Sequence, residues 1–235
     1  DLYGLPVSYA PEVQVEECII HPAGEDVPVM EKIYHTPAGD LTARVRQTED
    51  WPWGDHVPYL DDYLIPRSTK FLVETADDLD AYQYLLAPPT DAEIESFIAE
   101  AQPVKAFARA HGLLVTGGWG VGMDMAGWIH GLNTLVYDVY DRPEFLKAMF
   151  AMIAAWNRQR MTVVLDAGID CFVKRAWYEN ADFFTPTAWG EFIQPELRED
   201  VRLAHQAGAK FAYIITANAM PLLDLIVETG VDAII

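Results

Sequence analysis

The stretch Phe211–Ile235, FAYIITANAMPLLDLIVETGVDAII, decides the fold. Its first residues are consecutively apolar and rich in branched and aromatic side chains, as in a strand that is buried on both faces. A turn and an apolar helical segment follow, and Gly230 then precedes a second short apolar run. A strand, a helix and another strand in this order form the repeating unit of a parallel sheet.

The same alternation of helix and strand extends back to Thr90. Helical segments end near a glycine, which supplies a left-handed cap, and a short apolar run follows. These pairs are Gly112 with LLVT, Gly168 with IDCFVK, and Gly208 with AKFAYIIT. The pattern predicts an α/β fold whose parallel sheet is either closed as a barrel or open and doubly wound.

A repeated tripeptide favours the barrel. Gly168-Ile169-Asp170 and Gly230-Val231-Asp232 each introduce a strand, as in a fold built from repeated units. We therefore predict a TIM (β/α)8-type barrel with its strand-initiating aspartates on the stability face. A complete barrel needs eight units, so we expect the barrel in this chain to be incomplete at both ends.

Local signals place the helix ends. Thr90-x-x-Glu93 is a capping box, and Asp141-Arg142-Pro143-Glu144 is a second start signal. Pro103 is expected to kink or break the first of these helices. Pro195 is expected to interrupt a third helical stretch, around Trp189–Ala207.

The first ninety residues differ in composition from the rest. They are rich in proline and lack a long amphipathic period, and HTPAGDLTARVRQ predicts a hairpin whose turn is Pro37–Asp40. We divide the chain into residues 1–89, a hairpin and Pro/aromatic-rich region that belongs to the barrel domain, and residues 90–235, the (β/α) barrel portion.

Charge and cysteine content limit the partners and the compartment. Acidic residues number 36 against 16 basic ones, for a net charge of −20, which disfavours nucleic acid and anionic membrane surfaces. No run of 18 apolar residues exists. Two cysteines are too few for a disulfide scaffold, so we expect a cytoplasmic protein. A homodimer is left open.

GGWGVGMD, at Gly117–Asp124, does not satisfy the phosphate-loop patterns. Met123 stands where a P-loop needs lysine and where one dinucleotide pattern needs glycine. We predict a flexible loop at the C-terminal end of a strand, where barrel enzymes place their sites. Trp119 and Asp124 are then candidates for substrate binding, and a structural turn is the alternative.

FVKRAWYENADFF is the densest group of reactive side chains. Lys174 and Arg175 end a strand, and Trp177, Tyr178 and Glu179 follow. The two cations could bind a substrate carboxylate, and Tyr178 or Glu179 could act as the catalytic general acid. The alternative is a solvated loop held by salt bridges.

Three segments resemble the uroporphyrinogen decarboxylase superfamily, which also contains the corrinoid-dependent methyltransferases. They are GWIHGLNTLVYDVYDRPEFL, FTPTAWGEFIQPELREDVRLAHQAGAK and MPLLDLIVETGVDAII. HTPAGDL is similar to the Thr-Pro-x-Gly hairpin of the methyltransferase branch. The resemblance implies a TIM barrel that binds its substrate at the C-terminal mouth.

The resemblance further implies a methyltransferase that demethylates a small methylated substrate, such as a methoxy compound, and passes the methyl group to a corrinoid carried by a partner protein. Tyr178 or Glu179 would donate a proton, Lys174 or Arg175 would hold an anionic end, and Trp119 and Trp177 would wall the pocket. Asn218 matches an asparagine of the family.

The resemblance departs from the family at its zinc motif. Ile214 and Thr216 stand where the methyltransferases have His-x-Cys, and neither supplies the strong N or S donor that zinc needs. We therefore expect no zinc at these positions. Two other functions stay open: a uroporphyrinogen decarboxylase-type lyase acting on a porphyrinogen carboxylate, which would favour a basic mouth, and a non-catalytic small-molecule-binding barrel.

Overall fold

The computed structural model describes residues 1–118 and 121–235, and the side chains at 119 and 120 lie outside the described part. Contacts within the chain divide it into two compact units. The parallel unit comprises Asp1–Ser8, Pro88–Asp124 and Phe150–Ile235, and the antiparallel unit comprises Tyr9–Ala87 and Met125–Met149. A unit boundary therefore lies near the change of composition at residue 90, whereas no such change marks Met125–Met149.

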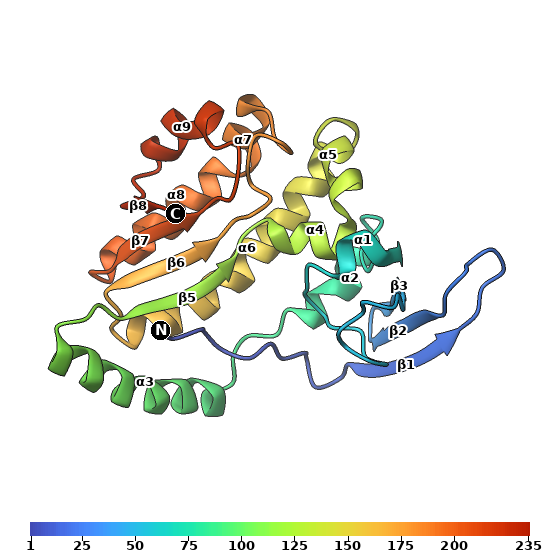
Figure 1. Ribbon diagram of the computed structural model, residues 1–235, viewed down its shortest axis with the longest axis horizontal. Coiled ribbons are helices and arrows are strands. Elements are labelled where there is room, and N and C mark those ends of the chain that lie inside the picture. The colour runs from blue at the N-terminus through green and yellow to red at the C-terminus, as the bar shows by residue number, and fades with distance from the viewer. The chain divides into compact units, whose positions relative to one another are not determined.

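The parallel unit contains a four-stranded sheet. Its strands are β5 (Thr116–Val121), β6 (Cys171–Arg175), β7 (Lys210–Ile214) and β8 (Ala233–Ile234), parallel and adjacent in chain order (Figure 1). The prediction that four apolar runs form neighbouring parallel strands is confirmed. Leu2 adds a parallel bridge to Gly117 beside β5. The described residues do not close this sheet into a barrel, so the structure establishes a mixed α/β fold.

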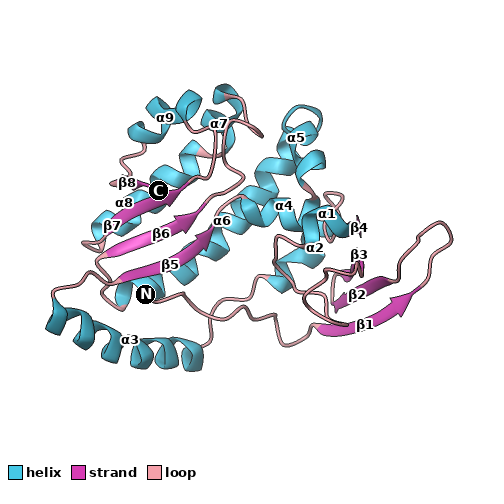
Figure 2. Cartoon of the chain, viewed as in Figure 1, coloured by secondary structure: helices cyan, strands magenta, loops and turns pink.

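Helices accompany the strands in the predicted alternation (Figure 2). They are α3 (Asp91–His111), α6 (Pro143–Asp166, which begins in the antiparallel unit), α7 (Pro186–Phe192), α8 (Gln194–Gln206) and α9 (Leu223–Glu228). The 3₁₀ helix Met220–Leu222 precedes α9. Thr90 and Glu93 form the expected capping box. Helices α7 and α8 are separated at Ile193, so the interruption near Pro195 is confirmed.

Two element boundaries in this unit differ from those the sequence predicted. Helix α3 is not broken at Pro103, because a proline removes only one N–H donor and buried Phe97 and Ala101 anchor the same helix. The strand expected at LLVT begins only at Thr116. Gly117 lies within this strand and packs closely against its neighbours. A Cβ at this position would lie 2.8 Å from side-chain atoms of Ile169 and Val164, so only glycine fits without a shift.

The repeated aspartates hold the N-terminal edge of the sheet. Asp170 precedes β6, and its Oδ2 accepts a hydrogen bond of 2.7 Å from the Val115 N–H, just before β5. Asp232 precedes β8, and its Oδ2 accepts one of 2.9 Å from the Phe211 N–H in β7. Each aspartate thus ties its strand to the preceding one, which is the stabilising role that the sequence predicted.

The antiparallel unit holds a second sheet in the order β1 (Gln14–Ile20), β2 (Val29–Thr36), β3 (Gly39–Arg46) and β4 (Ser68–Lys70). Its helices are α1 (Leu64–Arg67), α2 (Asp78–Tyr82), the 3₁₀ helix Gln83–Leu85, α4 (Asp124–His130, which begins in the parallel unit) and α5 (Leu132–Asp141). Strands β2 and β3 form the predicted hairpin. Thr36 Oγ1 accepts from the Ala38 N–H and donates to the Gly39 carbonyl, which holds the turn.

Candidate functional site

Three loops meet at the C-terminal edge of the parallel sheet. They follow β5 (residues 122–124), β6 (176–180) and β7 (215–218). Backbone hydrogen bonds join them: the Gly122 N–H donates to the Arg175 carbonyl, and the Ala176 N–H donates to the Ile214 carbonyl. Parallel α/β sheets bind ligands at this edge, so it is the candidate site.

Asp124 lies fully buried beneath the loop after β6. Its Oδ2 accepts a hydrogen bond of 3.0 Å from the Trp177 N–H, and its Oδ1 accepts one of 2.8 Å from the Tyr178 N–H. Burial and the nearby negative charge of Glu179 raise the pKa of Asp124 to about 6. The two N–H hydrogen bonds and the charge of Arg175 lower the pKa, but their combined effect is smaller. The Asp124 side chain therefore holds the loop through its backbone. A residue that contacts the substrate directly would be open to solvent, and Asp124 is not.

Arg175 and Trp177, two of the predicted substrate-binding residues, contact each other. The guanidinium carbon of Arg175 lies 3.8 Å from the centroid of the Trp177 ring, a cation–π contact. Arg175 Nε also lies 3.7 Å from Asp124 Oδ2. Arg175 is buried and Trp177 is half-buried, so the indole is the more accessible member of the pair.

Tyr178 and Asn218 lie on the loops at the same edge. The half-buried ring of Tyr178 packs edge-on against Phe183, with 5.6 Å between ring centroids. Asn218 is exposed, adopts a left-handed backbone with φ of 41°, and donates a 2.9 Å hydrogen bond to Asp182. The side chain of Trp119, the remaining predicted wall of the pocket, lies outside the described residues.

Lys174 and Glu179, which we expected at the open edge, point instead toward the helices that cover the sheet. Lys174 Nζ lies 2.9 Å from Oδ2 of Asp200 on α8. Glu179 Oε1 accepts a 2.7 Å hydrogen bond from the Met123 N–H, and its Oε2 accepts one from the Tyr213 hydroxyl. Successive strand residues face opposite sides, so Lys174 and Arg175 cannot both face the same side of the sheet.

The buried charges of Lys174, Asp200 and Glu179, between the sheet and the helices, compensate one another. Burial alone would lower the pKa of Lys174, but the negative charges of Asp200 and Glu179 outweigh it, and the pKa is raised. Burial and Glu179 together raise the pKa of Tyr213 well above its usual value. Gly122 leaves the space for this arrangement, because a Cβ there would overlap Glu179 Oε1.

The sequence interpretation missed Gly122, Asp200 and Tyr213. A signal for Asp200 was present, because it lies among Leu197, Val201 and Ala204 on the apolar face of α8. A carboxylate on a buried helix face needs a buried cation, which points to an interior partner. Gly122 and Tyr213 carry no comparable signal in the sequence.

The residues at the zinc positions do not fit a zinc ion. Ile214 has no donor atom in its side chain, and Thr216 Oγ1 donates a 3.2 Å hydrogen bond to the Trp177 carbonyl. In the part of the chain that the structure describes, no three His, Cys, Asp or Glu side chains gather as a metal site would require.

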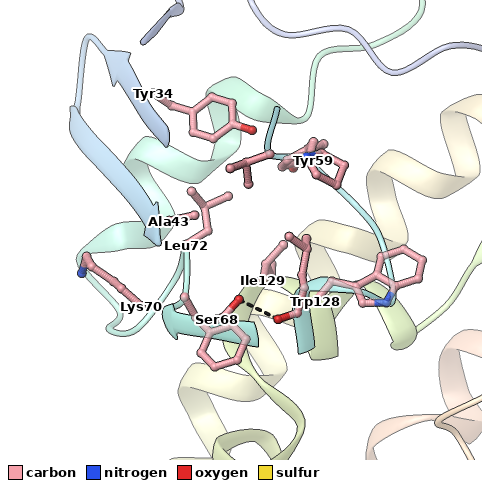
Figure 3. Close-up of a pocket in the computed structure, with 12 residues that line it drawn as sticks. Tyr34, Ala43, Tyr59, Ser68, Lys70, Leu72, Trp128 and Ile129 are labelled. Atoms are coloured by element: carbon pink, nitrogen blue, oxygen red, sulfur yellow. Dashed lines mark hydrogen bonds between the residues drawn. The ribbon is translucent and has the colours of Figure 1, made fainter. Parts of the chain in front are cut away.

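A cavity within the antiparallel unit is too small for a ligand. Figure 3 shows Tyr34, Tyr59, Ser68 and Trp128 around it, with Ser68 Oγ donating a 2.8 Å hydrogen bond to the Leu64 carbonyl. Its volume is about 10 Å³, which admits at most one water. This cavity is therefore not a candidate for ligand binding.

Across the described residues, no helix combines the length and apolar character needed to cross a membrane. The chain matches no protein-family model and no curated protein. Among solved structures, it is similar to a methyltransferase from Methanosarcina mazei, with a TM-score of 0.51 and 14% sequence identity. The match covers 63% of this chain and 44% of that protein, so the chain spans less than half of its length. At this identity, the similarity establishes a shared fold.

Proposed function

We propose that the protein is a methyltransferase of the uroporphyrinogen decarboxylase-like superfamily, with its parallel sheet forming part of a TIM-type barrel. The substrate would be a small methylated compound, such as a methoxy compound, and the acceptor a corrinoid carried by a partner protein. The parallel strands in chain order, the loops gathered at their C-terminal edge and the fold shared with a methyltransferase support this proposal.

The proposed reaction needs a proton donor. When the C–O bond of a methoxy group breaks, the methyl group passes to the acceptor, and the bonding electrons stay on the oxygen, which then takes a proton. The corrinoid would supply the nucleophilic centre that accepts the methyl group. The phenol of Tyr178 is the donor that fits best, because it is half-buried at the sheet edge on a loop whose backbone is held in place.

Glu179 fits a supporting role better than that of the donor. The Met123 N–H and the Tyr213 hydroxyl already occupy its two oxygens, and its side chain is fully buried. A proton transfer from Glu179 to a substrate at the edge would require the loop to rearrange.

The neighbouring residues would orient the substrate. Arg175 is buried behind the more accessible Trp177, so its charge would attract the carboxylate or phenolate of the substrate without direct contact. Trp177 would form an apolar wall against the substrate ring. Asn218 would supply a polar contact from the loop after β7, and Trp119 would complete the wall. Lys174 lies on the helix-covered side, so it would support the site without contacting the substrate.

The end of β6 and the loop after it carry the proposal, because they hold both the Arg175–Trp177 pair and Tyr178. The test is methyl transfer from 3-methoxybenzoate to reduced free cobalamin, followed by absorbance and by the appearance of 3-hydroxybenzoate. Anisole is the control substrate, because it differs from 3-methoxybenzoate in lacking the carboxylate that Arg175 would attract. Its KM should therefore be higher than that of 3-methoxybenzoate. Absence of transfer from a panel of methoxy compounds would exclude the proposed activity.

A further inference from the structure

We propose that Asp124 is a positioning residue for Tyr178: its carboxylate holds two consecutive backbone N–H groups and thereby fixes the loop that presents the phenol. The role assigned to Tyr178 rests on the proposed function. The positioning of the loop itself rests on geometry alone and can be tested without a substrate.

Two carboxylates clamp the loops after β5 and β6 to each other. Asp124, at the end of the first loop, accepts the N–H groups of Trp177 and Tyr178 at 3.0 and 2.8 Å. Glu179, in the second loop, accepts the N–H of Met123 at 2.7 Å. Each loop thus supplies one carboxylate and receives the other. Because Asp124 and Glu179 are both fully buried, water cannot readily replace either set of bonds.

The groups around Asp124 make this clamp sensitive to pH. The N–H groups of Tyr178 and Trp177 and the charge of Arg175 on β6 favour the anion of Asp124, whereas burial and Glu179 in the facing loop oppose it. The pKa of Asp124 is about 6 in the closed clamp, and exposure to water on opening would return it to near 4. The closed form therefore binds the proton more tightly, so a rise in pH from 4 to above 6 favours opening, by about 100-fold at most.

Hydrogen exchange of the amides at residues 177 and 178 tests the clamp in the full chain. After correction for intrinsic exchange, wild type should open at least 10-fold more at pH 7 than at pH 4.5. Asp124→Asn, which mimics the neutral acid, should lose this pH dependence. Asp124→Ala should open at least 10-fold more than wild type at pH 4.5, because both acceptors are gone.

Asp170→Ala is the matched control for Asp124→Ala, since Asp170 also accepts a backbone N–H but at the opposite edge of the sheet. It should raise exchange at Val115 and leave residues 177 and 178 as in wild type. Wild-type protection of residues 177 and 178 in Asp124→Ala would overturn the proposal.

Catalysis provides the second readout. With 3-methoxybenzoate, Asp124→Ala should lower kcat at least 10-fold with little change in KM, because loss of both acceptors misplaces the donor, which affects the transition state more than binding. An unchanged kcat would overturn the positioning role. If wild type transfers no methyl group, the proposed function fails, and the exchange experiment still decides whether Asp124 holds the loop.

Discussion

Lys174 Nζ lies 2.9 Å from Oδ2 of Asp200, and both residues are almost completely buried. The pair joins β6 to α8 in the layer between sheet and helices. Arg158 contacts the other oxygen of Asp200, also at 2.9 Å, and Glu179 adds a negative charge near Lys174. Lys174 is the buried cation that depends on Asp200, whereas half-buried Arg158 also pairs with Glu196, so removing Asp200 should cost more than removing Lys174.

Asp200→Asn should reduce the free energy of unfolding by about 3 kcal/mol, because it leaves Lys174 and Arg158 without their shared anion. Urea unfolding measures the loss. Lys174→Met is the matched variant and should cost less, since Arg158 still compensates Asp200. Wild-type stability of Asp200→Asn would show that the layer is hydrated in solution.

Gly122→Ala should reduce the free energy of unfolding by about 2 kcal/mol, because the new Cβ would overlap the carboxylate of Glu179. Thermal unfolding measures the loss. Gly190→Ala is the control: its Cβ would meet neighbouring atoms at 3.9 and 4.0 Å, which is ordinary contact, and alanine favours helix α7. Equal stability of the two variants would argue against the buried position of Glu179.

Asp124 should make the protein less stable as pH rises. Its folded pKa of about 6 exceeds the usual value near 4, so the folded state binds more protons than the unfolded state between these values. Its contribution to stability is complete below pH 4 and is lost as pH rises through 6, by up to about 3 kcal/mol. Urea unfolding from pH 4 to 7.5 should show Asp124→Asn gaining stability relative to wild type. A difference that is independent of pH would contradict the raised pKa.

Tyr178→Phe and Glu179→Gln should affect different properties. Loss of the phenolic proton donor should lower kcat about 100-fold in the methoxybenzoate assay, with little change in KM or stability. Glu179→Gln should instead lower the free energy of unfolding, because an amide cannot accept both buried hydrogen bonds. Tyr140→Phe, on the exposed face of α5, is the control for tyrosine substitution. A large loss of kcat in Glu179→Gln at wild-type stability would make Glu179 the donor.

Local signals in the sequence determined the elements and their order. The predicted glycine caps at Gly112, Gly168, Gly208 and Gly230 all have positive φ, between 64° and 87°. They determine where helices end because few other residues adopt this conformation without strain. The capping box is also local, because Thr90 and Glu93 lie three residues apart. The repeated aspartates mark where strands begin, although the N–H groups they accept, at Val115 and Phe211, lie far along the chain.

Only the tertiary structure decided which side chains face the candidate site. The sequence predicted that Lys174 and Arg175 end a strand, but a strand buried on both faces lacks the polar alternation that would distinguish its two sides. The ion pair with Asp200 places Lys174 on the side of the sheet that the helices cover. The missing side chain of Gly122 leaves the space that the Glu179 carboxylate occupies. Both positions depend on neighbours far along the chain, because a buried charge lies where a partner compensates it, and the sequence around the charge does not identify that partner.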